Sequence, residues 1–140
     1  MSKKILSSLS LVLTILLLSN STAMAAVNGT MSSNYISAYS AYVSSDGSGN
    51  ITVWFEAYGT NIMDEIGALK IELQEKASGS STWKTIKTYS NLLTYNDMYY
   101  ESGVNYSGKT GNAYRSYVTV WASKNGEGDS RITLTNSIIG

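Results

Sequence analysis

The clearest pattern along the chain is a strict two-residue alternation over residues 113–123. Successive side chains of a strand point to opposite faces, so this alternation predicts a strand with one buried and one exposed face. Glycine and asparagine, the residues typical of turns, lie on both sides of it. The face predicted to be buried carries Tyr114, Ser116, Val118, Val120 and Ala122, and the exposed face carries Arg115, Tyr117, Thr119 and Trp121.

Shorter alternations predict six further strands, at residues 34–44, 51–58, 68–76, 81–89, 98–104 and 131–137. In residues 68–76 the pattern places Leu69, Ile71 and Leu73 on one face. In the last strand Ile132 and Leu134 share one side. Residues 59–67 between two of these strands predict a crossover with one helical turn.

Seven strands with short turns and no long helix predict an all-β fold. We expect a single antiparallel β-sandwich of about seven strands, of the immunoglobulin or fibronectin type III kind. The third, fourth, sixth and seventh strands would form one sheet, and the first, second and fifth the other. Tyr114 follows a glycine-rich turn, where such folds often place a corner tyrosine.

The N-terminus has the three parts of a secretory signal peptide. Lys3 and Lys4 precede an apolar run over residues 5–18, and Ala23-Met24-Ala25 follows as a cleavage site. The alternative is an uncleaved membrane anchor, but the run is shorter than the roughly 20 residues that span a bilayer. We therefore expect residues 1–25 to be the signal, residues 26–140 to be the β-sandwich domain, and the protein to be secreted, without stable membrane insertion after cleavage.

Composition excludes several chemistries. The chain has no cysteine, histidine or proline, which excludes disulfides, cysteine nucleophiles, Ser-His-Asp triads and His or Cys zinc sites. Without Lys3 and Lys4, eight basic residues face ten acidic ones. This balance argues against nucleic acid and against electrostatic binding to anionic membranes, because both need a basic surface.

Four segments, GTNIMDEIGA, IELQEK, STWKTIKTY and SGKTGNAYRSYVTVWA, carry a resemblance to a known family. Together they resemble an uncharacterised family of small secreted bacterial β-sandwich proteins, a domain of unknown function, over roughly residues 35–135. The resemblance implies a β-sandwich, secretion and a bacterial source. It implies no activity and assigns no catalytic residues.

Exposed aromatic side chains form the strongest candidate site. Trp83, Tyr117 and Trp121 are predicted to point outward from one sheet, close to Arg115, and these four residues are the candidate ligand-binding set. Flat aromatic rows hold sugar rings or partner surfaces. The alternative is that aromatic pairs only stabilise a solvated sheet, at roughly 0.2–1 kcal/mol per pair. Trp54 and Tyr58 raise the same question on the opposite sheet.

Carboxylates give weaker candidates, at Asp64 with Glu65, Glu72 with Glu75, and Glu127 with Asp129. A glycosidase needs two carboxyls across a cleft, whereas neighbours on a strand point to opposite faces. Loops 46–50 and 125–129 place oxygen ligands at alternate positions, as calcium sites do, but hairpin loops favour the same residues. We predict no catalytic residues, metal or cofactor, and the sequence leaves calcium at Asp46 or Asp129 open.

These observations predict a secreted, non-enzymatic binding module whose partner is an unknown extracellular protein or glycan. A structural component of an extracellular assembly is the alternative. A hydrolase that uses carboxylates is less favoured.

Overall fold

The structure is a computed structural model that describes residues 33–140. The predicted signal peptide and its cleavage site lie outside these residues. Neighbouring strands pair antiparallel, which confirms the all-β antiparallel class. Within residues 33–140 no helix is long and apolar enough to cross a membrane. The strands are β1 (Ile36–Ser45), β2 (Asn50–Lys76), β3 (Lys84–Ser107), β4 (Ala113–Lys124), β5 (Glu127–Leu134) and β6 (Ile138–Ile139).

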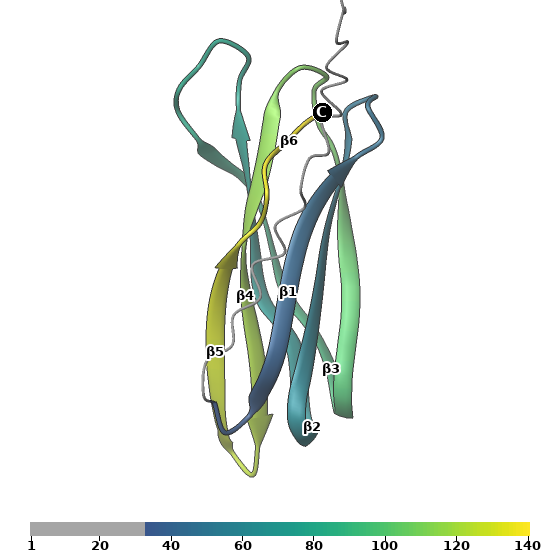
Figure 1. Cartoon of the computed structure of the whole chain (residues 1–140), viewed down its shortest axis with the longest axis vertical. Coiled ribbons are helices and arrows are strands. Elements are labelled where there is room, and N and C mark those ends of the chain that lie inside the picture. Colours follow the sequence, from purple (N-terminus) through teal and green to yellow (C-terminus); the bar gives the residue numbers. More distant parts are fainter. Residues whose placement is uncertain (1–32) are drawn as a thin grey trace, which may run out of the picture.

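Two strands are far longer than predicted. β2 unites two predicted strands with the segment predicted to be a crossover, and β3 unites the next two. Asn91 and Asn96 in β3 have positive φ values of 58° and 53°, and asparagine tolerates this conformation, so β3 bends without ending. The prediction of seven separate strands and a helical turn is therefore wrong. The described chain has six strands in one sheet that curls into a half-barrel (Figure 1).

The two ends of β2 have different neighbours. In its first part Val53 pairs with Val43 of β1 on one side and with Val104 of β3 on the other. In its second part Ile71 pairs with Tyr89 of β3 and with Val118 of β4. β5 pairs along the other side of β4. The curl therefore brings the β1 region opposite the β4 region.

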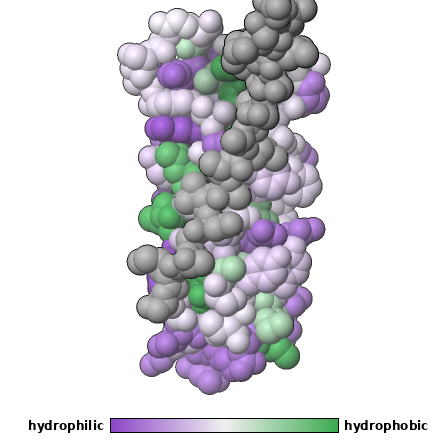
Figure 2. All heavy atoms as spheres, viewed as in Figure 1, coloured by the Kyte–Doolittle hydropathy of each residue, from purple (hydrophilic) through white to green (hydrophobic). Residues whose placement is uncertain are grey.

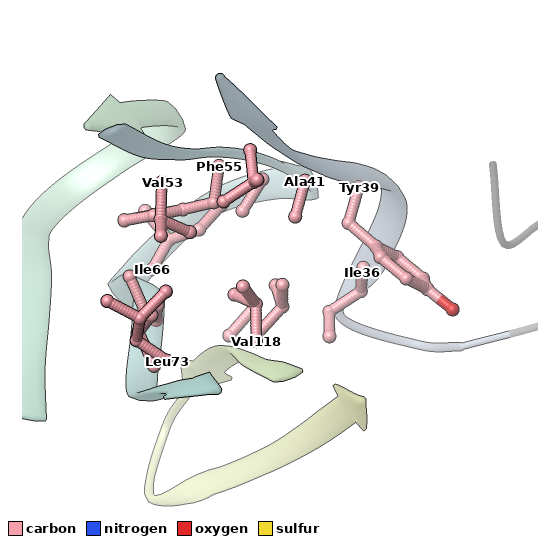
Figure 3. Close-up of a cluster of buried hydrophobic side chains, with 14 of the residues drawn as sticks. Ile36, Tyr39, Ala41, Val53, Phe55, Ile66, Leu73 and Val118 are labelled. Carbon is pink, nitrogen blue, oxygen red and sulfur yellow. The ribbon is translucent and has the colours of Figure 1, made fainter. Parts of the chain in front are cut away.

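The hydrophobic core fills the inside of this curl. Figure 3 shows Val53 and Phe55 of β2 pointing toward Ile66, Leu73 and Val118, which belong to the facing part of the sheet. All five are at most 2% exposed, and each buried side chain of this size contributes about 1.5–3 kcal/mol. The alternation predicted for β4 is confirmed, since Tyr114, Ser116, Val118, Val120 and Ala122 are all 0% exposed.

Leu69 departs from simple alternation, whereas the strand around Ile132 follows it. A register shift between Ala68 and Lys70 leaves Leu69 without a partner in the β2–β4 ladder. Leu69 is only partly buried, whereas Ile71 and Leu73, predicted to share its face, are fully buried. In β5, Ile132 is 68% exposed and Thr133 only 4%. The apolar side of the last strand therefore faces solvent rather than the core.

Side-chain hydrogen bonds join the two edges of the half-barrel. The Asn136 side chain accepts from the Val43 N–H at 2.9 Å and donates to the Val43 carbonyl at 3.0 Å, as a neighbouring strand would. At the other end of β1, the Tyr35 hydroxyl donates to Glu127 at 2.9 Å, which raises the pKa of Tyr35. These bonds tie the β1 region to the start of β5 and to the segment that follows β5.

Tyr114 fixes the turn that precedes β4. Its hydroxyl accepts from the backbone N–H of Lys109 and donates to Glu75, both at 2.6 Å. Burial raises the pKa of Tyr114, and the Glu75 hydrogen bond adds to the rise. Tyr114 therefore bonds back to the turn that precedes β4.

Candidate functional site

The outward side chains around β4 form the first candidate surface, which we call the Arg115 face. It is built by the second part of β2, β4, β5 and the residue before β3. Hydrophobic surface on the side of the molecule shown in Figure 2 is broken up by polar atoms, and one green patch lies over β5. The members of the Arg115 face are Lys70, Glu72, Gln74, Trp83, Arg115, Tyr117, Thr119, Trp121 and Ile132.

Arg115 lies between two aromatic rings on this face. Its guanidinium carbon is 4.3 Å from the ring centroid of Trp83 and 5.8 Å from that of Tyr117. Its Nε–H donates to the Gln74 side chain at 2.8 Å. The rings and the amide fix the guanidinium plane, because a cation is attracted to the faces of aromatic rings.

A second cation reinforces the positive character around Arg115. Lys76 Nζ lies 5.1 Å from the centroid of the Trp83 ring. Farther along the face, Lys70 forms an ion pair with Glu72 at 3.1 Å. Net positive charge on this face is therefore concentrated around Trp83, at the end next to the β2–β3 turn.

Trp121 does not join this cluster. Its indole N–H donates to Glu65 at 3.0 Å. Its ring lies over Gly128 of β5 so closely that a Cβ there would come within 2.5 Å of a ring carbon. Tyr117 and Trp121 are four residues apart, or about 13 Å along a strand. Three of the four predicted residues, Trp83, Arg115 and Tyr117, are thus brought together, and Trp121 packs separately.

A second aromatic surface lies around the first part of β2, and we call it the Glu56 face. Tyr42 stacks on Trp54 with ring centroids 6.4 Å apart, and Tyr58 packs on Tyr99 at 4.6 Å. The register of β1, β2 and β3 defines its members as Ala38, Ser40, Tyr42, Ser44, Thr52, Trp54, Glu56, Tyr58, Tyr99, Glu101, Gly103 and Asn105.

Sequence reasoning placed Trp54 and Tyr58 on this surface but missed the carboxylates between the aromatic pairs. Glu56 and Glu101 are direct cross-strand partners. The alternation of residues 51–58 was enough to place Glu56 outward. The partnership with Glu101 depends on the register of two strands, which no local pattern reveals.

The predicted carboxylate pairs all have structural partners. Asp64 accepts from the backbone N–H of Asn125 at 2.7 Å, and Glu65 accepts from Trp121. Glu72 pairs with Lys70, Glu75 with Tyr114 and Glu127 with Tyr35. Asp64 thus anchors the β4–β5 turn.

The two loops considered for calcium are also held by their own hydrogen bonds. Asp46 accepts from the Ser48 N–H at 2.7 Å and from the Asn50 side chain at 2.6 Å. The Asn50 and Ser48 bonds lower the pKa of Asp46. In the second loop Asp129 pairs with Arg131, and hydrogen bonds from Ser33 and Arg131 lower its pKa. Residues 33–140 contain no group of three or more acidic side chains placed to hold a metal ion.

Comparison of this chain with protein-family models, with curated proteins and with solved structures finds no match. The resemblance to a family of small secreted bacterial proteins therefore stays a prediction. Function has to be inferred from the two faces themselves.

Proposed function

We propose that this protein is a secreted, non-enzymatic binding module that holds an anionic extracellular ligand at Trp83, Arg115 and Tyr117. The observation that carries this proposal is the position of Arg115, which is stacked between two rings and has only its Nε–H engaged. No other hydrogen bond found within residues 33–140 uses its guanidinium.

A guanidinium presents five N–H donors in a planar fork that matches a carboxylate or phosphate. In Arg115, Gln74 takes the Nε–H, which leaves the four donors on the two terminal nitrogens for a ligand. The stacked rings fix the side chain before the ligand arrives, so less rotamer entropy is lost on binding. Lys76 beside Trp83 adds a second positive charge.

The ligand class shares an acidic group, which an acidic glycan or an acidic protein segment can supply. The absence of catalytic function is supported by the carboxylates at Asp64, Glu65 and Glu75, which each hold a structural hydrogen bond. Secretion is supported by the basic start, the apolar run and the Ala23-Met24-Ala25 site.

We also propose that the half-barrel is a variant of the immunoglobulin or fibronectin type III sandwich. In support, the first part of β2 lies between β1 and the end of β3, while β4 lies between the second part of β2 and β5. This is the division of strands expected for that sandwich. The bond from Tyr114 back to Lys109 adds to the likeness.

Binding to two acidic probes tests the function. The mature chain, residues 26–140, is titrated with polyuronate and with an oligoglutamate peptide, each beside a neutral counterpart. Arg115→Ala is expected to weaken binding of the acidic probe about 10–100-fold, since charge-assisted hydrogen bonds contribute about 1.5–3 kcal/mol. Arg115→Lys, which keeps the charge but loses the fork, is expected to fall between parent and Arg115→Ala.

Lys109→Ala is the matched control, because it removes a cation that makes no contact with the Trp83 ring. Tighter binding of polyuronate would identify the ligand as a glycan, and tighter binding of oligoglutamate would identify it as a protein. Equal binding of both acidic probes by the parent and Arg115→Ala would contradict the proposal.

A further inference from the structure

The Glu56 face carries charge of only one sign. Its twelve outward positions include Glu56 and Glu101 but no lysine or arginine. The Arg115 face, in contrast, carries its cations beside aromatic rings. Two aromatic surfaces of one small domain thus differ in the charge they present.

The two carboxylates of this face are placed directly opposite each other on neighbouring strands. Like charges in this position repel and destabilise the sheet. Ser40 donates to Glu56 at 2.7 Å, and the Tyr99 hydroxyl donates to Glu101, which raises the pKa of Tyr99. These neutral hydroxyls orient the carboxylates but do not offset their charge.

Aromatic pairs flank the carboxylates on both sides along the strands. The Trp54 ring lies over Gly103, where a Cβ would come within 2.9 Å of a ring carbon, so the glycine lets the indole lie flat on the sheet. Tyr42, Trp54 and Tyr58 are each 37–39% exposed. Exposed ring faces attract ammonium and guanidinium groups.

We propose that the Glu56 face binds a basic, extended segment of a partner protein, with lysine or arginine side chains seated at Glu56 and Glu101. Charge complementarity selects this occupant, because a cation between the carboxylates removes their repulsion and two aromatic pairs border the place where it sits. A neutral glycan would use the rings but would leave the two opposed charges uncompensated.

The dimensions of the face suit an extended chain. The rows at Trp54 and Tyr58 are four residues apart, about 13 Å along the strand, with Glu56 midway. An extended peptide spans this distance with about four residues, and alternate side chains point the same way. A segment with basic residues at alternate positions would therefore present them to one side.

Fluorescence anisotropy with a labelled eight-residue peptide that carries lysine at alternate positions tests this site. The matched probe replaces every lysine with glutamine. The parent is expected to bind the lysine peptide at least 10-fold more tightly than the glutamine peptide, and less tightly as salt rises. The double variant Glu56→Gln with Glu101→Gln is expected to lose that preference.

Two more variants keep the test independent of folding. Trp54→Leu retains both carboxylates and is expected to weaken lysine-peptide binding about 3–10-fold, as the loss of a cation–π partner predicts. Glu72→Gln on the Arg115 face is the control and should bind like the parent. Arg115→Ala should also bind the lysine peptide like the parent, which separates this proposal from the proposed function.

Three results would overturn the proposal. One is equal binding of the two peptides by the parent, and another is parent-like binding by the double glutamine variant. The third is self-association in light scattering that the double glutamine variant and Arg115→Ala each abolish, which would assign the face to a second copy of this chain.

Discussion

The Arg115 face and the Glu56 face are built alike but differ in charge. On each, a tryptophan lies over a glycine of a neighbouring strand, Trp121 over Gly128 and Trp54 over Gly103. Trp54 is 39% exposed, whereas Trp121 is half-buried and its indole N–H is bonded to Glu65. Gly103 is the direct cross-strand partner of Trp54, whereas Gly128 lies two residues from the partner of Trp121. A tryptophan over a glycine thus serves packing in one place and leaves an exposed ring in the other.

The two faces belong to one sheet with a single hydrophobic core, so a substitution that destabilises this core should destabilise both faces. Leu73 is 0% exposed inside the curl, so Leu73→Ala is expected to lower the free energy of unfolding by about 2–5 kcal/mol. Urea denaturation followed by tryptophan fluorescence measures this loss. Ile132→Ala is the control, because Ile132 is 68% exposed and its loss should change stability by less than about 0.5 kcal/mol. Similar losses for both would contradict the position of the core.

The next largest effect should follow from removing the hydrogen bonds that join the two edges of the half-barrel. Asn136→Ala removes both bonds to the Val43 backbone and is expected to destabilise by about 1–3 kcal/mol. Val43 belongs to neither face, so both probes should still bind at temperatures where the variant is folded. If the variant leaves amide hydrogen exchange at Val43 unchanged, the two bonds between Asn136 and Val43 do not form.

A smaller effect should separate two tryptophans of the Arg115 face. Trp121→Ala is expected to cost about 1–2 kcal/mol of stability and to leave acidic-probe binding unchanged, because its ring packs on Gly128. Trp83→Ala should instead weaken acidic-probe binding about 3–10-fold, because it releases Arg115. Melting curves and titrations of the two variants measure this. The reverse pattern would restore Trp121 to the ligand site.

The smallest expected effect is at Asp46, which belongs to neither face. Hydrogen bonds from Asn50 and Ser48 lower the folded-state pKa of Asp46. Its stabilisation is therefore present above the unfolded carboxyl pKa of about 3.9 and is lost as pH falls through the lower folded-state value. The melting temperature of the parent should exceed that of Asp46→Ala at pH 6, and the difference should shrink below about pH 4. A difference that grows toward acid would contradict this sign.

Local alternation predicted what a single strand determines by itself. The two sides of β4 were correct because the period of two assigns Val118 inward and Arg115 outward whatever lies next to the strand. It could not reveal that β2 and β3 continue through their bends. Asn91 and Asn96 are typical turn residues, yet here they bend a strand whose ladder with β2 persists on either side of each bend.

The candidate sites divide in the same way. Outward positions such as Tyr117 and Trp54 could be predicted, because the two-residue period of a strand assigns alternate side chains to the outer face. The pairing of Glu56 with Glu101 could not, because the register between strands far apart in sequence depends on the whole sheet. The stacking of Trp83 on Arg115 likewise depends on how the turn before β3 folds back toward β4.

The opposite ligand preference of the two faces is tested most directly by titrating Arg115→Ala and the double variant Glu56→Gln with Glu101→Gln against each probe in turn. Arg115→Ala is predicted to lose binding of the acidic probe and to retain binding of the lysine peptide. The double glutamine variant is predicted to lose binding of the lysine peptide and to retain binding of the acidic probe. If either variant loses both probes, or neither variant loses any, the two faces are not separate binding sites.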